Sequence, residues 1–210
     1  MTAGSPPHVD LAGRVGNIDI YWLDQILKGR IPPTARILDA GCGGGRNLVW
    51  LLRTGHDVHG VDASEEAIAS VRQTASSLVA GLMPDDRFRV ASARALPFED
   101  ESFDVVLAVA LLHFCESDQA FDEMLREMAR VLRPGGLFFA RLASNIGIED
   151  RVRPIEGRIH ELPDGSTRYL VDEELLLTRT SSFPAELIEP IKTTVVQGMR
   201  SMTTWVCCKR

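Results

Sequence analysis

Short apolar runs alternate with segments of helical character along the first two thirds of the chain, and this alternation constrains the fold most. The runs have the length of buried strands, and the intervening segments carry apolar residues at helical spacing. Successive parallel strands need crossover connections, so the pattern predicts a parallel sheet with helices on both faces. The five runs lie at 36–40, 57–61, 88–90, 104–109 and 137–142.

Two β-rich runs near the end of the chain follow a different rule. They lie at 188–196 and 202–208, and only a short stretch containing Gly198 separates them. A connection this short suits an antiparallel hairpin and leaves no room for a crossover helix. We therefore predict an α/β fold with a doubly wound, mostly parallel seven-stranded sheet and a C-terminal antiparallel hairpin.

The domain organisation follows from the length and from the spacing of these elements. With 45% hydrophobic residues, the chain has enough apolar material for one core, so we predict a single domain over 1–210. An amphipathic helix is expected over 14–31, the parallel core over 36–145, and the terminal hairpin over 187–208. A turn flanked by alternating residues predicts a hairpin insertion over 151–170, at the end of the sheet where ligands bind.

Charge and cysteine usage exclude several classes. The formal net charge of −6 argues against the basic face that a nucleic-acid partner needs, and no apolar run approaches the roughly 20 residues of a membrane span. The first residues lack the basic flank and apolar core of a signal peptide. The four cysteines lack zinc-site spacing, so we predict no metal site, free thiols and a cytoplasmic location. Oligomeric state stays open.

A glycine-rich turn follows the first strand run, and an acid follows the second. Neither glycine register fits the dinucleotide fingerprint, since its third position falls on Arg46 or Leu48, and a phosphate loop would need Lys-Ser/Thr in place of Arg46-Asn47. Asp62 lies about 20 positions after Gly41, the spacing of a ribose-binding acid, although a surface Asp beside the Ser64 helix cap is the alternative. The pattern favours an adenosine ligand without a diphosphate over a nicotinamide cofactor.

Five short motifs occur in order: Ile37-Leu38-Asp39-Ala40-Gly41-Cys42-Gly43-Gly44-Gly45; Val61-Asp62-Ala63; Leu96-Pro97-Phe98 with Ser102-Phe103-Asp104; Leu112-His113; and Leu132-Arg133-Pro134-Gly135-Gly136. Together they resemble class I S-adenosylmethionine-dependent methyltransferases, particularly the small bacterial branch with ubiquinone/menaquinone-type and tellurite-resistance-type enzymes. The resemblance covers about residues 36–145 and fits the terminal hairpin. It implies a Rossmann-like methyltransferase fold with S-adenosylmethionine as cofactor.

The resemblance implies a cofactor site at the ends of the strands. In such a site Asp39 and the backbone of Gly41 and Gly43 would hold the methionine part of the cofactor, and Asp62 would hold the ribose. The cofactor-site residues it implies are Asp39, Gly41, Cys42, Gly43, Gly45, Asp62, Ala63, Ser92, Ala93, Val109 and Ala110.

The adenine side departs from the family pattern at one position. Ala63 would cover one face of the ring, and Ser92 stands where the family usually has an acid after the third strand. A serine oxygen can still accept a hydrogen bond from the adenine amino group, and the backbone of Ala93 would meet the ring. Val109 and Ala110 would offer backbone near the methionine ammonium.

Acceptor-side residues are assigned more openly. His113 is the candidate general base if the acceptor is a hydroxyl or phenol, and a structural histidine is the alternative. Tyr21 would cover the cofactor or belong to the core. Arg141, with Asn145 just beyond, would bind an anionic acceptor or close a salt bridge within the sheet. We interpret the polar residues of 151–170, Arg158, His160 and Arg168, as a solvated face.

The favoured function is methyl transfer to a small-molecule acceptor. The fourth strand run ends in Ala110-Leu111-Leu112-His113, without the Pro-Pro-aromatic signature that the family uses on nucleic-acid bases. The alternative is a non-catalytic S-adenosylmethionine-binding sensor or assembly subunit, which would keep the cofactor residues and lose acceptor-side polar groups.

Overall fold

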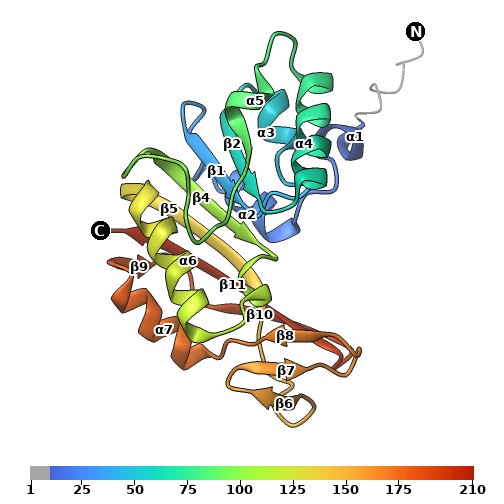
Figure 1. The fold of residues 1–210 in the computed structure, drawn as a ribbon, viewed down its shortest axis with the longest axis vertical. Helices are drawn as coiled ribbons and strands as arrows, with labels where there is room; N and C mark the ends of the chain where they lie inside the picture. The colour runs from blue at the N-terminus through green and yellow to red at the C-terminus, as the bar shows by residue number, and fades with distance from the viewer. Residues whose placement is uncertain (1–9) are drawn as a thin grey trace, which may run out of the picture.

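The computed structural model describes residues 10–210, which form a large twisted sheet, a small sheet and the helices that cover them (Figure 1). In the large sheet the strand order is β10-β11-β5-β4-β1-β2-β3, and β9 pairs with β11. The strands are β1 (Arg36–Ala40), β2 (Asp57–Asp62), β3 (Phe88–Val90), β4 (Phe103–Val109), β5 (Leu132–Ala143), β9 (Ala185–Leu187), β10 (Lys192–Val196) and β11 (Arg200–Lys209).

The pairing directions confirm the predicted fold class. β1 pairs in parallel with β2 and β4, β2 with β3, and β4 with β5, whereas β11 runs antiparallel to β5 and to β10. The short strand β9 adds an eighth member that the sequence analysis did not predict. The chain moves outward in opposite directions from β1 and β4, so the sheet has its topological switch point between these two strands.

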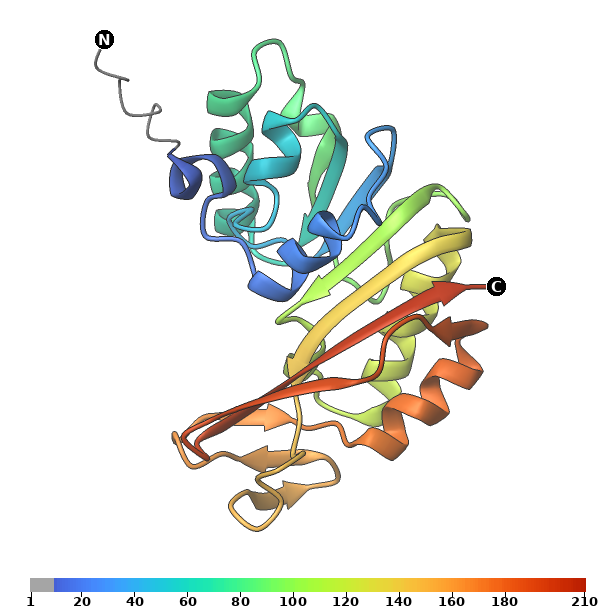
Figure 2. The ribbon, with the colours of Figure 1, turned by 180° about the vertical axis from the view of Figure 1, so that it is seen from behind.

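Helices cover both faces of the sheet (Figures 1 and 2). One face packs against α6 and α7 through a core that includes Phe121, Leu125 and Leu176, and the other packs against the remaining longer helices through Trp22 and Leu51. The helices are α1 (Leu11–Val15), α2 (Ile20–Leu27), α3 (Val49–Arg53), α4 (Glu65–Leu78), α5 (Pro84–Arg87), η1 (Leu112–Phe114, a 3₁₀ turn), α6 (Asp118–Val131) and α7 (Glu173–Ser182).

Two of these helices begin where their sequences predict. Ser64 accepts a hydrogen bond from Ala67 N at 3.2 Å at the start of α4, and Ser117 accepts one from Ala120 N at 3.1 Å at the start of α6. Each cap satisfies a backbone N–H that has no partner inside its helix. Because β2 ends at Asp62 and Ser64 caps α4, the helix begins directly after the strand.

The helix predicted over 14–31 is wrong in its extent. Gly16 adopts a left-handed conformation (φ +68°), which ends α1, and α2 begins only after Asp19. The Asp19 carboxylate accepts hydrogen bonds from the N–H groups of Tyr21 and Trp22 at 2.9 and 3.3 Å. A helix start is therefore built at position 19, because the glycine interrupts the helix and the aspartate caps a new one.

The small sheet lies beyond the carboxyl end of β5 (Figure 1). The predicted hairpin corresponds to β7 (Ile159–Glu161) and β8 (Thr167–Tyr169), and β6 (Arg153–Glu156) adds a third strand on the far side of β7. A bridge between Ser144 and Val171 ties this sheet to the end of β5. The insertion is thus held at the edge of the large sheet where its parallel strands end.

Two further observations bear on the sequence analysis. Among residues 10–210, no helix combines the length and apolarity needed to cross a bilayer. The cysteines at 42, 115, 207 and 208 are all free thiols, and the first three are buried. The interpretation of the first residues as lacking a signal peptide concerns residues 1–9, which lie outside the described part of the chain.

Candidate active site

The loops that follow β1 and β4 are packed against each other at the switch point. Gly41, just after β1, has φ +73°, and a Cβ built on it would lie 2.7 Å from Leu111 Cδ1. Only glycine permits both the left-handed turn and this close approach. The backbone after β1 therefore runs directly beside the start of η1, at the edge where doubly wound sheets bind ligands.

Asp39 has the environment of a ligand-binding acid. It is 1% exposed in β1, and neither of its carboxylate oxygens has a hydrogen-bond partner among the residues that the structure describes. The pKa of Asp39 is raised to about 7, mainly by burial; the Arg46 guanidinium opposes this rise and the Asp62 carboxylate adds to it. An unpaired buried carboxylate is costly, so this position fits a ligand that supplies N–H donors and positive charge.

Asp62 joins the ends of β1 and β2. Its Oδ2 accepts a hydrogen bond from Gly43 N at 2.9 Å, and its Oδ1 accepts one from Ser64 N at 2.9 Å. Each carboxylate oxygen can accept a further hydrogen bond, so two hydroxyls of a ribose fit the same group. A Cβ on Gly43, whose φ is +51°, would meet nothing within 4 Å, so the loop faces open space beside this acid.

Cys42 and Gly45 of the glycine-rich loop pack inward. Cys42 is 5% exposed, and burial raises the pKa of its thiol, which therefore stays protonated. A Cβ on Gly45 would lie 2.5 Å from Val71 Cγ2 on α4. Cys42 and Gly45 therefore contact the protein interior, whereas Gly43 borders the open space outside the loop.

The residues expected to contact adenine lie beside Asp62. Ala63 and Ser92 are exposed, and Ala93 is buried. The carbonyl of Asp62 accepts a hydrogen bond from Ala91 N at 2.9 Å, which brings the loop after β3 against the end of β2. Ser92 Oγ accepts a hydrogen bond from Arg94 N at 3.2 Å and keeps its own hydroxyl proton available.

The turn after β4 directs the chain toward the same place. Val109 is buried, and Ala110 adopts φ +58°, which is uncommon for a residue with a Cβ. Ala110 N donates a hydrogen bond to the Arg141 carbonyl at 2.8 Å. This bond holds the strained turn in place and leads the chain into η1, which carries His113.

His113 is buried and neutral. It is 6% exposed, and its Nδ1 accepts a hydrogen bond from Ala143 N at 3.1 Å. Burial, together with the smaller effect of the nearby Arg168 charge, lowers the pKa of His113 to about 4. Because Nδ1 accepts a backbone N–H, the proton of the neutral ring lies on Nε2. The Nε2–H group can donate a hydrogen bond, but the Nδ1 lone pair already accepts one from Ala143 N and is not free to take a proton from an acceptor.

A cavity of about 190 Å³ lies beside His113, between the carboxyl ends of β4 and β5 and the two hairpins that extend beyond them. Ala110 and Ala143 line it from the large sheet, Arg168 from β8, and Arg200 from β11. The cavity thus adjoins the turn after β4, whose residues Val109 and Ala110 the sequence analysis assigns to a cofactor site.

Two predicted acceptor residues, Tyr21 and Arg141, contact each other and do not line the cavity beside His113. The Arg141 guanidinium is centred 4.7 Å from the Tyr21 ring and pairs with Asp19 Oδ2 at 3.0 Å. The Tyr21 hydroxyl bonds to Thr194 Oγ1 on β10. Arg141 therefore has an internal carboxylate partner, which corresponds to the salt-bridge alternative. Asn145 keeps a buried Oδ1 without a partner among residues 10–210.

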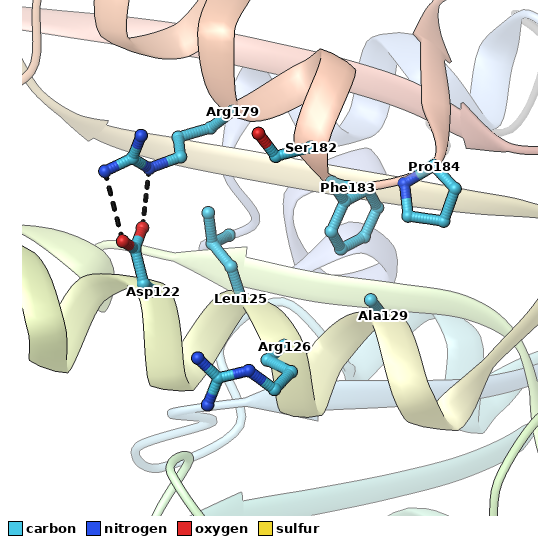
Figure 3. A pocket seen from close by; sticks show the side chains of 8 residues that line it. All are labelled: Asp122, Leu125, Arg126, Ala129, Arg179, Ser182, Phe183 and Pro184. Atoms are coloured by element: carbon cyan, nitrogen blue, oxygen red, sulfur yellow. Dashed lines mark hydrogen bonds and ion pairs between the residues drawn. The ribbon is translucent and has the colours of Figure 1, made fainter.

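Two of the larger cavities lie elsewhere and contain none of the predicted site residues. One, of about 320 Å³, lies between α6 and α7, where the Arg179 guanidinium donates hydrogen bonds of 2.6 and 3.1 Å to the Asp122 carboxylate (Figure 3). The other, of about 440 Å³, lies at the amino ends of β1 and β2, around Arg36 and Asp57. Within the described residues, no group of three or more His, Cys, Asp or Glu side chains could hold a metal ion.

Sequence reasoning missed two cavity residues, Arg168 and Arg200. Arg168 was interpreted as part of a solvated face, but it is only partly exposed and lines the cavity. Arg200 lies in the terminal hairpin and is not among the predicted site residues. The available signal was the expected position of 151–170 at the ligand-binding edge, which makes a basic residue there a candidate contact.

Comparison with known proteins agrees with this geometry. A family profile described as a methyltransferase domain matches residues 38–140. The methyltransferase GfsG of Streptomyces halstedii is 41% identical over 103 residues, which cover 48% of this chain and 35% of that protein. A ubiquinone biosynthesis O-methyltransferase of Sinorhizobium fredii is 33% identical over 175 residues, or 82% of this chain and 62% of that protein.

A similar solved structure extends the likeness to the fold. A crystal structure from Methanosarcina mazei, described as a SAM-dependent methyltransferase, superposes with a TM-score of 0.70 at 22% identity, over 88% of this chain and 96% of that one. The chain spans less than two thirds of the length of the two curated relatives.

Proposed function

The chain belongs to the class I S-adenosylmethionine-dependent methyltransferases through residues 38–140, and on this premise we propose that it transfers a methyl group from S-adenosylmethionine to a small-molecule acceptor. The observation that carries the proposal is the Asp39 carboxylate, which is buried without a partner in the described structure. A cationic ligand with N–H donors resolves that cost, and the methionine ammonium of the cofactor has this chemistry.

The remaining cofactor contacts follow from position. Asp62 would accept hydrogen bonds from the ribose, Gly43 would present its backbone to the cofactor, and Ala63 with Ser92 would flank the adenine. The cofactor would supply an activated methyl group on a sulfonium, and the neutral thioether released when the S–CH₃ bond breaks is a good leaving group. The chain then has to bind the acceptor, orient its nucleophilic atom in line with the S–CH₃ bond, and exclude water.

We propose that His113 serves as a hydrogen-bond donor to the acceptor and not as a general base. Its Nδ1 lone pair is engaged by Ala143 N, and its low pKa keeps the ring neutral at neutral pH. The Nε2–H group can therefore orient an acceptor oxygen or nitrogen. An acceptor that needs no base, such as an ionised or soft nucleophile, fits this arrangement better than an alcohol.

The acceptor class and the location belong to the same proposal. The net charge of −6 supports a metabolite acceptor in preference to a nucleic acid. Free buried thiols at Cys42, Cys115 and Cys207 support a reducing, cytoplasmic setting.

Transfer of a radiolabelled methyl group tests this function. The purified protein is incubated with methyl-labelled S-adenosylmethionine and a cell extract, and the label is followed into small-molecule, protein and nucleic-acid fractions. We expect label in the small-molecule fraction, and Asp62→Ala should abolish it. Binding of the cofactor without transfer to any fraction would instead support the non-catalytic sensor or assembly subunit.

A further inference from the structure

The cavity beside His113 has an unbalanced charge. Among residues 10–210, no carboxylate lies within ion-pair distance of Arg168, and residues 1–9 contain no Asp or Glu. None of the residues that line the cavity is acidic. A partly buried guanidinium without a carboxylate partner is uncommon, because positive charge removed from water is normally paired.

The second arginine of the cavity does not share this property. Arg200 pairs with Asp164, which also accepts hydrogen bonds from Ser166 N at 2.9 Å and Ser166 Oγ at 2.6 Å. The Arg200 charge is thus compensated. Since His113 is neutral, the cavity carries one net positive charge, and this charge belongs to Arg168.

Two contacts within the protein orient the Arg168 guanidinium. Its Nη1 donates to the Thr167 carbonyl at 2.6 Å, and its Cζ lies 4.9 Å from the centre of the Phe114 ring. These contacts use one of its five donors and one face, so donors remain for a ligand. A guanidinium held in place and carrying adjacent N–H groups matches the two oxygens of a carboxylate.

We propose that the methyl acceptor carries a carboxylate and that Arg168 binds this group in the cavity beside His113. The proposal rests on the function proposed above, since the cavity receives an acceptor only if the neighbouring turn at Ala110 borders the cofactor. His113 Nε2–H is a second donor on the same cavity, which suits an acceptor with an oxygen near its carboxylate. The carboxylate is assigned a binding role.

Paired probes of equal shape test the proposal. Benzoate is compared with benzamide, and octanoate with octanamide, by calorimetric titration into the protein saturated with S-adenosylhomocysteine. We expect at least one carboxylate to bind about tenfold more tightly than its amide, because a charge-assisted bidentate contact is replaced by a neutral one. Arg168→Gln should remove this preference, and Arg168→Lys should retain part of it.

A matched variant controls for net charge. Arg126 on α6 is exposed and lies outside the cavity, so Arg126→Gln removes the same charge and should leave the preference unchanged. Equal binding of acid and amide in both pairs, or equal effects of Arg126→Gln and Arg168→Gln, would overturn the proposal. The two failures are distinguishable, since S-adenosylhomocysteine binding tests the cofactor site alone and should survive Arg168→Gln.

Discussion

Gly43 N donates a hydrogen bond of 2.9 Å to Asp62 Oδ2 and so links the loop after β1 to the end of β2. The donor belongs to a glycine whose missing side chain leaves open space, and the acceptor is the predicted ribose acid. The hydrogen bond fixes the two residues relative to each other, in positions that the proposed adenosine ligand would use. The loop is thus a turn that also presents a candidate binding surface.

Replacing Gly43 with alanine separates the effect of this glycine on stability from its effect on ligand binding. Gly43 and Gly55 both have positive φ and open space at the Cβ position, so alanine at either should cost roughly 1 kcal/mol of stability. Only Gly43→Ala should weaken S-adenosylhomocysteine binding, because its methyl group enters the ligand space. Thermal unfolding and calorimetric titration of both variants measure this. Equal affinity of the two variants would count against a ligand at Gly43.

The raised pKa of Asp39 predicts proton release on binding. A cationic group beside Asp39 favours its ionised form, so S-adenosylhomocysteine should bind more tightly as the pH rises through about 7, with protons released below that pH. Titrations in buffers of different ionisation enthalpy measure the released protons. The Asp39→Asn variant should bind S-adenosylhomocysteine more weakly and should lack the proton release that Asp39 contributes. Unchanged proton release in this variant would contradict the assignment.

Asp39 also affects the unliganded protein. Its folded-state pKa of about 7 lies above the ordinary value of 3.8, so the folded state binds more protons between these values. Stability contributed by this group therefore falls as the pH rises from about 4 to 7, and Asp39→Asn should remove that part of the pH dependence. Urea unfolding at several pH values checks the sign.

The hydrogen bond from Ala143 N predicts the tautomer of His113. Nitrogen-15 NMR should show a proton on Nε2 and a ring that titrates near pH 4 rather than near its ordinary 6.5. Since this folded pKa is lowered, the associated stability is present above pH 6.5 and is lost as the pH falls toward 4. His113→Asn, whose Oδ1 can still accept from Ala143 N, should lose this dependence. An Nδ1–H tautomer would instead restore the general-base role.

The Arg141–Asp19 pair is expected to be structural. Asp19→Ala removes a helix cap and leaves Arg141 unpaired with 18% of its side chain exposed, so the protein should lose about 3 kcal/mol of stability. Asp24→Ala on the same helix breaks an exposed pair with Lys28 and should cost less than about 1 kcal/mol. Chemical denaturation compares the two. Similar losses would show that the pair contributes little.

The parallel sheet and the positions of the candidate cofactor-side residues at its edge could be predicted because their signals are local. Asp39 and Asp62 follow directly from the ends of apolar strand runs, and Ser64 and Ser117 cap helices as their sequences indicate. The break before α2 could also have been found, since Gly16 and Asp19 are visible in the sequence. The periodicity of the apolar residues outweighed them in the prediction over 14–31.

The acceptor side could not be predicted, because its contacts join distant segments. The partner of Arg141 lies 122 residues earlier in the chain, so the sequence left its role undecided between ligand and salt bridge. The net charge of the cavity that Arg168 lines depends on the pairing of Arg200 with Asp164, 36 residues away on another hairpin. The hydrogen bond that fixes the His113 tautomer likewise depends on how η1 packs against β5.

The central claim is that S-adenosylmethionine binds at the ends of β1 and β2, and calorimetric titration with S-adenosylhomocysteine tests it most directly. We predict one site per chain, with affinity weakened about 100-fold by Asp62→Ala through loss of charge-assisted hydrogen bonds, less by Asp62→Asn, and unchanged by Asp24→Ala. No binding to the unmodified protein, or equal binding by Asp62→Ala, would contradict the account.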